Sequence, residues 1–320
     1  MKIFVAGATG VLGRGLLRQF RNRGHEVVGL ARSEKGERIV RSLGGESRRA
    51  DLFDVDSLAR AAEGSEVVIH AVTAIPVNTK PVPADWRMND RVRREGTRAL
   101  CVAAKRIGAR IFLLQSIVWV ARPPDDSPFD ETSPAYPDPI THSAFDAECI
   151  AHDAGGKAGI RIAVLRCGYF YGPDAAHTQM MGEEIARRRL PVIGTEGAVW
   201  ANLHTDDAAS AFVTAAEAGR EGLWHVVDDQ PATVKEVLTE FSVQLGAPPP
   251  RRIPAWLARL IVGPHAVDFF TRSTRTTNTR FRADFGWKPQ YPSYREGIRQ
   301  IVAAWKAEGF PERGKSSEAA

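Results

Sequence analysis

Three glycines near the start of the chain carry the clearest chemical signal in the sequence. They lie in Gly7-Ala8-Thr9-Gly10-Val11-Leu12-Gly13, a G-x-x-G-x-x-G spacing that follows the apolar run 3–6. Glycines spaced in this way let the chain turn tightly after a strand and bring backbone N–H groups against a pyrophosphate. The N-terminus of the helix that follows also attracts this negative group. We therefore predict a dinucleotide site, with a merely tight turn as the alternative. The expected contacts in this turn are Gly7, Thr9, Gly10, Val11, Leu12 and Gly13.

The second predicted strand, residues 26–31, is followed by basic residues where dinucleotide sites often carry an acid. An acid there binds the 2′-hydroxyl of the adenosine ribose of NAD, whereas cations suit the 2′-phosphate of NADP. Arg32 and Lys35 follow this strand. The sequence therefore favours NADP(H) over NAD(H), and a solvated basic loop is the other interpretation.

Further cofactor contacts are expected at the carboxyl ends of the other strands, because parallel sheets bind their ligands there. For Asp51, the capping of a turn is an equally good interpretation, and Ser116 could simply close its strand. The expected residues, each at or just after the end of a predicted strand, are Asp51, Leu52, Ala71, Val72 and Ser116.

Short apolar runs alternate with helical patterns through the first half of the chain, which is typical of β-α-β units around a parallel sheet. Among the predicted helices are 11–23, 54–62, 86–107 and 143–154. We expect an α/β fold, a doubly wound parallel sheet of the Rossmann type with a smaller carboxyl-terminal α/β lobe for the substrate. Residues 1–168 would form the dinucleotide-binding domain, 169–311 the partly interwoven lobe and 312–320 a flexible tail.

The chain resembles the extended short-chain dehydrogenase/reductase superfamily, and within it the NAD-dependent epimerase/dehydratase branch and its atypical relatives. Besides the glycine turn and the Asp51-Leu52 pair, residues 165–173, 203–208 and 285–289 are similar to the family motifs L-R-x-x-N-V-Y-G-P, I-H-V-D-D-V/A and L-G-W-x-P. The resemblance covers roughly residues 1–310. It implies a Rossmann fold, a nicotinamide dinucleotide and redox or epimerase chemistry.

The proton-transfer pair of that family is missing from this sequence. The family moves a substrate proton with a Tyr-x-x-x-Lys pair and an upstream Ser, and the pair lies in the pattern Y-x-x-S-K-x-x-x-E. Ile140 stands at the Tyr position and Ala144 at the Lys position, while Ser143 and Glu148 match the Ser and the Glu. Neither Ile nor Ala can hold a proton, so another group has to supply it.

Ser116 and Tyr169 are the residues we expect in catalysis. Ser116 matches the family's upstream Ser, and Tyr169 lies where the family places a residue close to nicotinamide and substrate, so that its phenol could donate to a carbonyl. We expect the substrate against Trp119, His142, Tyr169 and His204, with Trp119 as an apolar wall. For His142 a surface position near a helix start is the alternative, and for His204 a role in orienting its own loop.

Composition excludes several classes of protein. Hydrophobic residues make up 43% and charged residues 25% of the chain, so it is neither disordered, nor collagen-like, nor a small disulfide scaffold. No apolar run approaches the length of a membrane helix. Three cysteines without C-x-x-C spacing indicate a reducing compartment, and we expect a cytoplasmic protein. The histidines lack metal-ligand spacing, so no metal is expected.

The net charge of +5 comes with arginine clusters that are scattered along the chain and have few aromatic residues between them. Such clusters are expected to be solvated faces, and nucleic-acid binding is disfavoured. The clusters are 48–49, 91–94, 187–189 and 251–252. Helix 86–107 could pair two copies, but its arginines argue against an apolar seam, so a monomer and a homodimer both stay open.

The leading hypothesis is an NADP(H)-dependent oxidoreductase that reduces or oxidises a small carbonyl or hydroxyl compound with a non-standard proton donor. One alternative is a sugar-nucleotide epimerase or dehydratase, although those reactions depend on the missing tyrosine. The other is a catalytically inactive NADP(H) sensor that regulates a partner protein.

Overall fold

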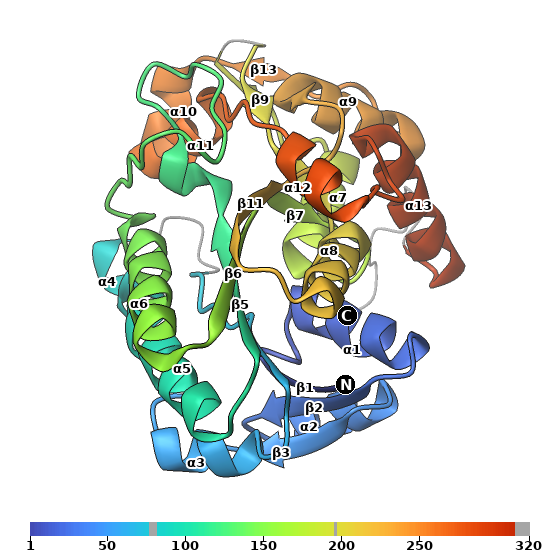
Figure 1. Ribbon diagram of the computed structural model, residues 1–320. Helices are drawn as coiled ribbons and strands as arrows, with labels where there is room; N and C mark the ends of the chain where they lie inside the picture. The colour runs from blue at the N-terminus through green and yellow to red at the C-terminus, as the bar shows by residue number, and fades with distance from the viewer. Residues whose placement is uncertain (77–81, 195–196, 311–320) are drawn as a thin grey trace.

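The computed structural model describes residues 1–76, 82–194 and 197–310, and a parallel sheet forms its centre (Figure 1). Seven strands pair in parallel in the order β11-β6-β5-β4-β1-β2-β3. The inner strands are buried nearly throughout, since helices cover both faces of the sheet. The strands are β1 Lys2–Ala6, β2 Glu26–Ala31, β3 Glu46–Arg49, β4 Val67–His70, β5 Ile111–Ile117, β6 Arg161–Cys167 and β11 Gly222–Val226.

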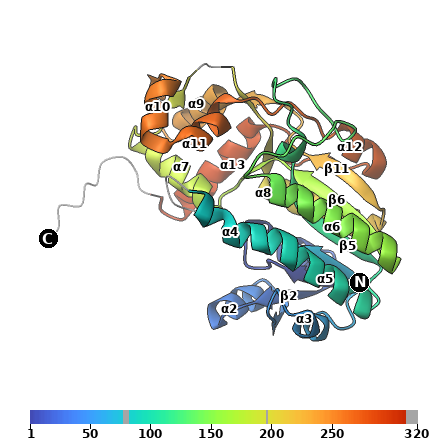
Figure 2. The ribbon, with the colours of Figure 1, turned by 90° about the vertical axis from the view of Figure 1, so that its left-hand side faces the viewer.

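Each face of the sheet is closed by its own buried apolar cluster, so the predicted doubly wound α/β fold is confirmed. Figure 2 shows the helices α4, α5 and α6 lying across one of these faces. This face carries α3 Val55–Ala61, α4 Pro83–Arg91, α5 Thr97–Arg106 and α6 His142–Ala158. The other face carries α1 Val11–Asn22, α2 Glu34–Ser42, α8 Thr205–Ala218 and α12 Thr279–Phe285.

The direction of strand addition reverses between β1 and β4. After β1 the chain adds β2 and β3 on one side and then crosses to β4, β5 and β6 on the other. The loops that follow β1 and β4 therefore diverge to opposite faces and leave a crevice at the carboxyl edge of the sheet. This is the place at which a doubly wound sheet binds a nucleotide.

The predicted helix 86–107 is continuous, but its middle is wound more widely. Between α4 and α5 the five residues Val92–Gly96 form a π-helical segment, η1. A π-helical turn shifts the side chains that follow it around the helix axis and is often found at functional sites. Here it turns Arg93 inward, where the side chain is 8% exposed, so the expectation that residues 91–94 form a solvated face is wrong for Arg93.

The rest of the chain builds the lobe around a third apolar cluster, as the fold prediction expected. Its short strands form three pairs, β7 Tyr169–Tyr171 with β10 Asn202–His204, β9 Val199–Trp200 with β12 Ala232–Thr233, and β8 Val192–Ile193 with β13 Arg252–Ile253. Its helices are α7 Ala176–Ala186, α9 Val234–Gln244, α10 Ala255–Val262, α11 Pro264–Thr271 and α13 Tyr294–Ala307, and a 3₁₀ turn, η2 Val118–Ala121, follows β5. Because β11 and α8 pack in the sheet layers, the two parts are interwoven. The predicted tail, 312–320, lies outside the described residues.

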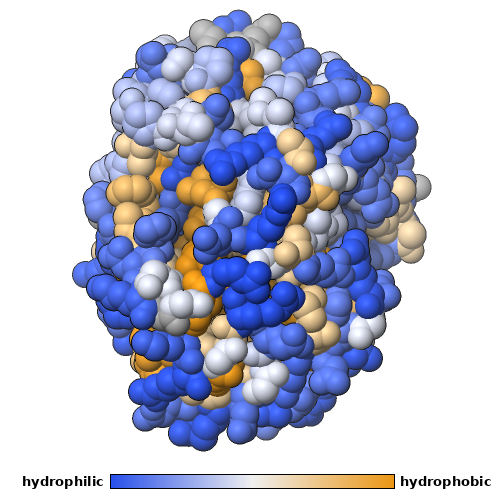
Figure 3. Space-filling view, viewed as in Figure 1, coloured by the Kyte–Doolittle hydropathy of each residue, from blue (hydrophilic) through white to orange (hydrophobic). Residues whose placement is uncertain are grey.

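Figure 3 shows the surface on the side from which Figure 1 is viewed. It is mostly hydrophilic, with a narrow apolar strip between α6 and α8, on the side where β11 forms the edge of the sheet. Within the described ranges, no helix has the length and apolar character that crossing a membrane requires.

Candidate active and cofactor-binding site

The turn between β1 and α1 leaves no room for side chains at two of its glycines. Gly7 has a φ of +93°, and a Cβ added to it would lie 2.5 Å from the carbonyl oxygen of Ala71. A Cβ added to Gly13 would lie 2.1 Å from the carbonyl oxygen of Gly7. Gly10 stands at the N-cap of α1 without a side chain to satisfy the first N–H groups of the helix. Those N–H groups are the donors a pyrophosphate needs, so the turn fits a dinucleotide.

The predicted 2′-phosphate residues lie on the surface next to this turn. Arg32 and Lys35 are exposed, and neither forms an ion pair within the parts of the chain that the structure describes. Ser33 caps α2 by accepting a hydrogen bond from the Gly36 backbone N–H at 3.2 Å. A Cβ added to Gly36 would lie 3.4 Å from Thr9 Cγ2, which brings Thr9 beside the start of α2. The arrangement leaves both cations available to an anion beside the glycine turn.

Asp51 and Leu52 have different surroundings. Asp51 is exposed, and its Oδ1 accepts a hydrogen bond from the Phe53 backbone N–H at 3.0 Å, as in a capped turn. Leu52 is 7% exposed, and its Cδ2 would lie 3.0 Å from a Cβ on Gly96. Leu52 therefore packs between the end of β3 and η1, and Asp51 keeps one carboxylate oxygen without a hydrogen bond in the described residues. Their contact with the cofactor stays a prediction.

A buried histidine, which the sequence analysis missed, holds the loop that contains Ala71 and Val72. His70 Nδ1 lies 3.3 Å from the Val72 backbone N–H nitrogen, and Nε2 lies 3.4 Å from the Val92 carbonyl oxygen. Burial lowers the pKa of His70 to about 4, so the ring is neutral near pH 7 and can accept at Nδ1 and donate at Nε2. His70 thereby joins the end of β4 to η1. A polar residue inside an apolar strand was the available signal.

Ser116 belongs to a buried hydrogen-bonded group. Its hydroxyl donates to Glu148 Oε1, and Arg166 donates from Nε to Oε1 at 2.9 Å and from Nη2 to Oε2 at 2.7 Å. All three residues are at most 6% exposed. Because the Ser116 proton is directed at Glu148, the lone pairs of Oγ remain for other donors. The sequence placed Ser116 and Glu148 in a family pattern but gave no sign that Arg166 would pair with them.

The positions of the missing proton-transfer pair lie at the start of α6. Ile140 is half-buried and Ala144 is buried, and neither side chain carries a polar atom. The guanidinium of Arg93 reaches the same place from η1, with Nη1 at 3.4 Å from both the Ile140 carbonyl oxygen and Ser143 Oγ. A buried cation therefore stands beside the positions at which the family carries Tyr and Lys.

Tyr169 lies in an aromatic cluster beyond the end of β6. Its ring centroid is 5.1 Å from that of Trp200 and 5.6 Å from that of Phe269, and Trp119 stacks on Phe269 at 5.9 Å. The Tyr169 hydroxyl makes no hydrogen bond within the described part of the chain. Burial raises the pKa of Tyr169 well above its usual value, so the phenol stays protonated. The predicted residues Trp119 and Tyr169 thus share one cluster, joined through Phe269.

The two predicted histidines lie apart from this cluster. The side chain of His142 is 55% exposed and faces Asp146, with Nδ1 at 3.2 Å from Oδ2. His204 is fully buried at the N-cap of α8, where Nδ1 accepts from the Asp206 backbone N–H at 3.2 Å. Burial lowers the pKa of His204 to about 4. As placed, His204 orients its own turn, the alternative weighed for it, and its contact with a substrate stays a prediction.

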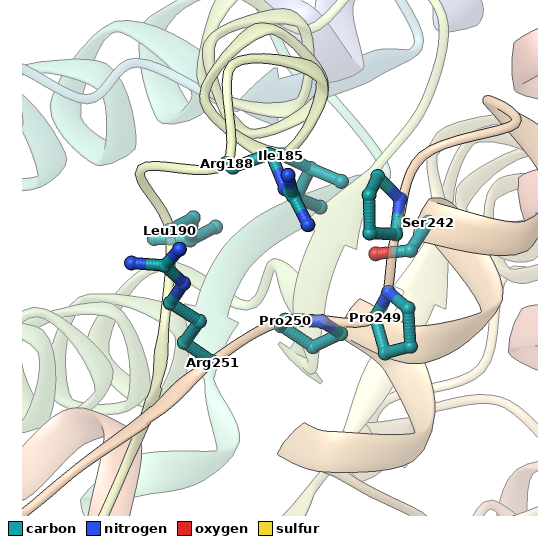
Figure 4. A pocket seen from close by; sticks show the side chains of 8 residues that line it. Ile185, Arg188, Leu190, Ser242, Pro249, Pro250 and Arg251 are labelled. Atoms are coloured by element: carbon teal, nitrogen blue, oxygen red, sulfur yellow. The ribbon is translucent and has the colours of Figure 1, made fainter.

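Figure 4 shows a small pocket elsewhere, between the end of α7 and the proline-rich segment after α9. Its volume of about 10 Å³ suits a single water molecule, so it is too small for a substrate. Among residues 1–76, 82–194 and 197–310, no three His, Cys, Asp or Glu side chains come together as metal ligands would. The unsatisfied N–H groups at the start of α1 make the carboxyl edge of the sheet the candidate site.

Comparison with known proteins places this geometry in a family. A family model described as "NAD dependent epimerase/dehydratase family" matches residues 3–226. The chain belongs to this family. A 3-diazoavenalumate denitrifying reductase from a Streptomyces species is 34% identical over 309 residues, which cover 93% of this chain and 99% of that protein.

Solved structures of the epimerase/dehydratase type have the same fold. UDP-glucose 4-epimerase from Thermus thermophilus, solved with NAD, matches with a TM-score of 0.78 at 24% identity, over 96% of this chain and 99% of that one. The human epimerase family protein SDR39U1, solved with NADPH, matches with a TM-score of 0.81 at 20% identity, over 95% and 99%. Membership of the family and the similarity to the Streptomyces reductase support an NAD(P)-binding enzyme with oxidoreductase-like chemistry.

Proposed function

We propose that the chain is an NADP(H)-dependent oxidoreductase for a small carbonyl or hydroxyl compound, in which Tyr169 supplies the proton that the family's missing tyrosine would supply. The observation that carries the proposal is the Tyr169 hydroxyl. It has no hydrogen-bond partner in the described residues, and it follows β6 by two residues. Ser116 is paired in register with Arg166 of β6, and Tyr169 follows Arg166 by three residues in the chain.

The cofactor would be held by residues whose free backbone and side-chain groups match its parts. The N–H groups at the start of α1 suit the pyrophosphate, and Arg32 with Lys35 suits a 2′-phosphate. A bound nicotinamide would supply or accept the hydride. The exposed, unpaired state of both cations supports NADP(H) over NAD(H), and the absence of an acid at the end of β2 agrees with it.

Proton transfer then falls to the protein. The phenol of Tyr169 would donate its proton to the substrate oxygen as negative charge develops there, and water would return a proton to the phenolate. Because an alkoxide is more basic than a phenolate, a raised Tyr169 pKa leaves this transfer favourable. Trp119 and Phe269 would exclude water and favour a flat, apolar substrate. Ser116, with its proton directed at Glu148, would accept rather than donate.

The test follows NADPH absorbance with a panel of aldehydes, ketones and enones. Tyr169→Phe should lower kcat about 100- to 10,000-fold on any accepted substrate, as expected for a lost general acid. Tyr136→Phe, at a side chain that is 45% exposed, is the matched control and should leave the rate unchanged. Equal rates for both variants would remove Tyr169 from the mechanism. Arg32→Ala should weaken NADPH far more than NADH, and equal affinities of the wild type for the two would refute the cofactor preference.

A sugar-nucleotide epimerase or dehydratase is the second candidate, favoured by the family match. Ile140 and Ala144 weigh against it, since neither can exchange a proton. Conversion of a UDP-sugar without net consumption of cofactor would decide for it. Tight NADPH binding without turnover of any compound would instead favour the sensor hypothesis. The cytoplasmic location and the choice between monomer and homodimer stay predictions.

A further inference from the structure

Arg93 is a buried cation without a counterion. Its side chain is 8% exposed, and no carboxylate of the described residues lies within ion-pair distance of it. The guanidinium makes two long hydrogen bonds, both from Nη1, at 3.4 Å to the Ile140 carbonyl oxygen and 3.4 Å to Ser143 Oγ. Nε and Nη2 make none, yet neither is fully buried. Most of the donor capacity of this side chain is therefore unused.

The nearby acids do not neutralise Arg93 by contact. Glu148 is already held by both nitrogens of Arg166 and by Ser116. Asp90, one turn earlier on the same helix, has a buried Oδ1 without a hydrogen-bond partner, and within the described residues it forms no ion pair with Arg93. Burial lowers the pKa of Arg93 to about 10, which keeps the guanidinium charged at neutral pH. The guanidinium of Arg93 is therefore charged although little water reaches it.

A cation in such a place is stabilised when an anion joins it. Taking a charge out of water is unfavourable unless a partner of opposite sign and matching hydrogen bonds replace the water. The place is the start of α6, beside the apolar side chains of Ile140 and Ala144, so a charged ligand bound there would meet the guanidinium of Arg93. It also lies near the carboxyl ends of β4 and β5, because His70 ties β4 to Val92 and Ser116 ties β5 to Glu148.

We propose that Arg93 binds an anionic oxygen of the substrate, and that the substrate class is a carbonyl compound that also bears a carboxylate. The planar guanidinium fork matches a carboxylate through two parallel hydrogen bonds, which a lysine could not form. That this ligand is a substrate rests on the proposed function. The binding of an anion by Arg93 does not depend on the chemical step. Arg93 is then a specificity-determining residue of this site.

The test measures binding by titration calorimetry, in the presence of NADP⁺, with phenylglyoxylate and its uncharged methyl ester as probes. The wild type should bind the acid about 10- to 100-fold more tightly than the ester, the strength of a charge-assisted hydrogen-bonded pair. Arg93→Met should abolish this preference, and Arg93→Lys should retain only part of it. Arg94→Met is the matched control, since Arg94 is 41% exposed and pairs with Asp146 on the surface. It should bind both probes as the wild type does.

Several outcomes would overturn the proposal. One is a wild type without preference for the acid, and another is an Arg93→Met protein that melts normally and keeps the preference. A parallel loss of affinity for NADP⁺ and 2′,5′-ADP in Arg93→Met would assign the anion to the cofactor instead of the substrate. If Arg93→Met does not fold, a competition titration on the wild type tests the proposal. Benzoate should displace phenylglyoxylate and the uncharged benzamide should not, and the opposite result would overturn the proposal. Since binding is measured without turnover, a failure to reduce either probe would count against the proposed function alone.

Discussion

Removal of Arg166 alone should cost more stability than removal of Arg166 and Glu148 together. Arg166→Met leaves the Glu148 carboxylate in a site where the side chain is 7% exposed, with only the Ser116 hydroxyl as a partner. An unpaired buried charge of this kind costs about 3–5 kcal/mol of unfolding free energy. In the double variant Arg166→Met/Glu148→Leu no buried charge is left, so we expect it to be more stable than the single variant by at least about 2 kcal/mol.

The melting temperature gives the same comparison on another scale. With an unfolding entropy of about 2.1 cal/mol/K per residue, 320 residues that unfold together give roughly 0.67 kcal/mol per degree. Arg166→Met should therefore melt about 4–8 °C below the wild type. Arg91→Met is the control, because Arg91 and Glu95 form a surface pair with side chains 48% and 53% exposed, and its loss should cost less than about 1 kcal/mol.

Urea unfolding followed by tryptophan fluorescence measures these differences. A deficit below about 1 kcal/mol, or a double variant as unstable as the single one, would refute the view that Arg166 neutralises a charged Glu148.

Three further predictions concern the cofactor crevice and the lobe. Gly13→Ala should lower NADP⁺ affinity in calorimetry, because the added Cβ would lie 2.1 Å from the Gly7 carbonyl oxygen, whereas Gly156→Ala, with nothing within 4 Å, should bind normally. His70→Leu should lower the unfolding free energy by about 1–3 kcal/mol in urea, since it leaves the Val72 N–H unpaired. Burial raises the pKa of Asp228 to about 8, so its contribution to stability is full below its unfolded pKa of about 3.9 and is lost as pH rises through 8. Asp228→Asn should flatten that part of the melting profile, and an unchanged slope would contradict a protonated Asp228.

Local patterns were sufficient for the sheet and the glycine turn. Apolar residues repeat with different periods in strands and in helices, so the sequence indicates which segments form which. At Gly7 and Gly13 the backbone of other residues lies too close for any side chain, so only glycine fits. The family motifs also pointed to Ser116, which lies near the carboxyl end of β5, and to Tyr169, which lies two residues beyond β6. The chemistry of these positions depends on partners that lie 18 residues or more away in the chain, as Glu148 does from Arg166.

The missed residues share one physical reason, which is that burial of a polar side chain is set by tertiary packing. Arg93 and Arg94 are adjacent in an arginine-rich stretch, yet the first is buried and the second forms a surface pair with Asp146. No spacing in the sequence predicts the π-helical segment in which Arg93 is buried and Arg94 is not. For His70 the sequence shows a polar residue among the apolar neighbours of β4, but it does not show the backbone groups of Val72 and Val92 that the ring contacts.

The π-helical segment also leaves the length of this stretch free to differ by one residue in a relative of the protein. A π-helical turn closes with hydrogen bonds from residue i to i+5 instead of i+4, so it takes up one residue more than an α-helical turn. With one residue fewer in 92–96 the helix could be unbroken, and Leu100, Ala103 and Ala104 would still face the sheet as they do now. Such a relative would share the apolar face of α5 with this protein although their sequences differ in length just before it.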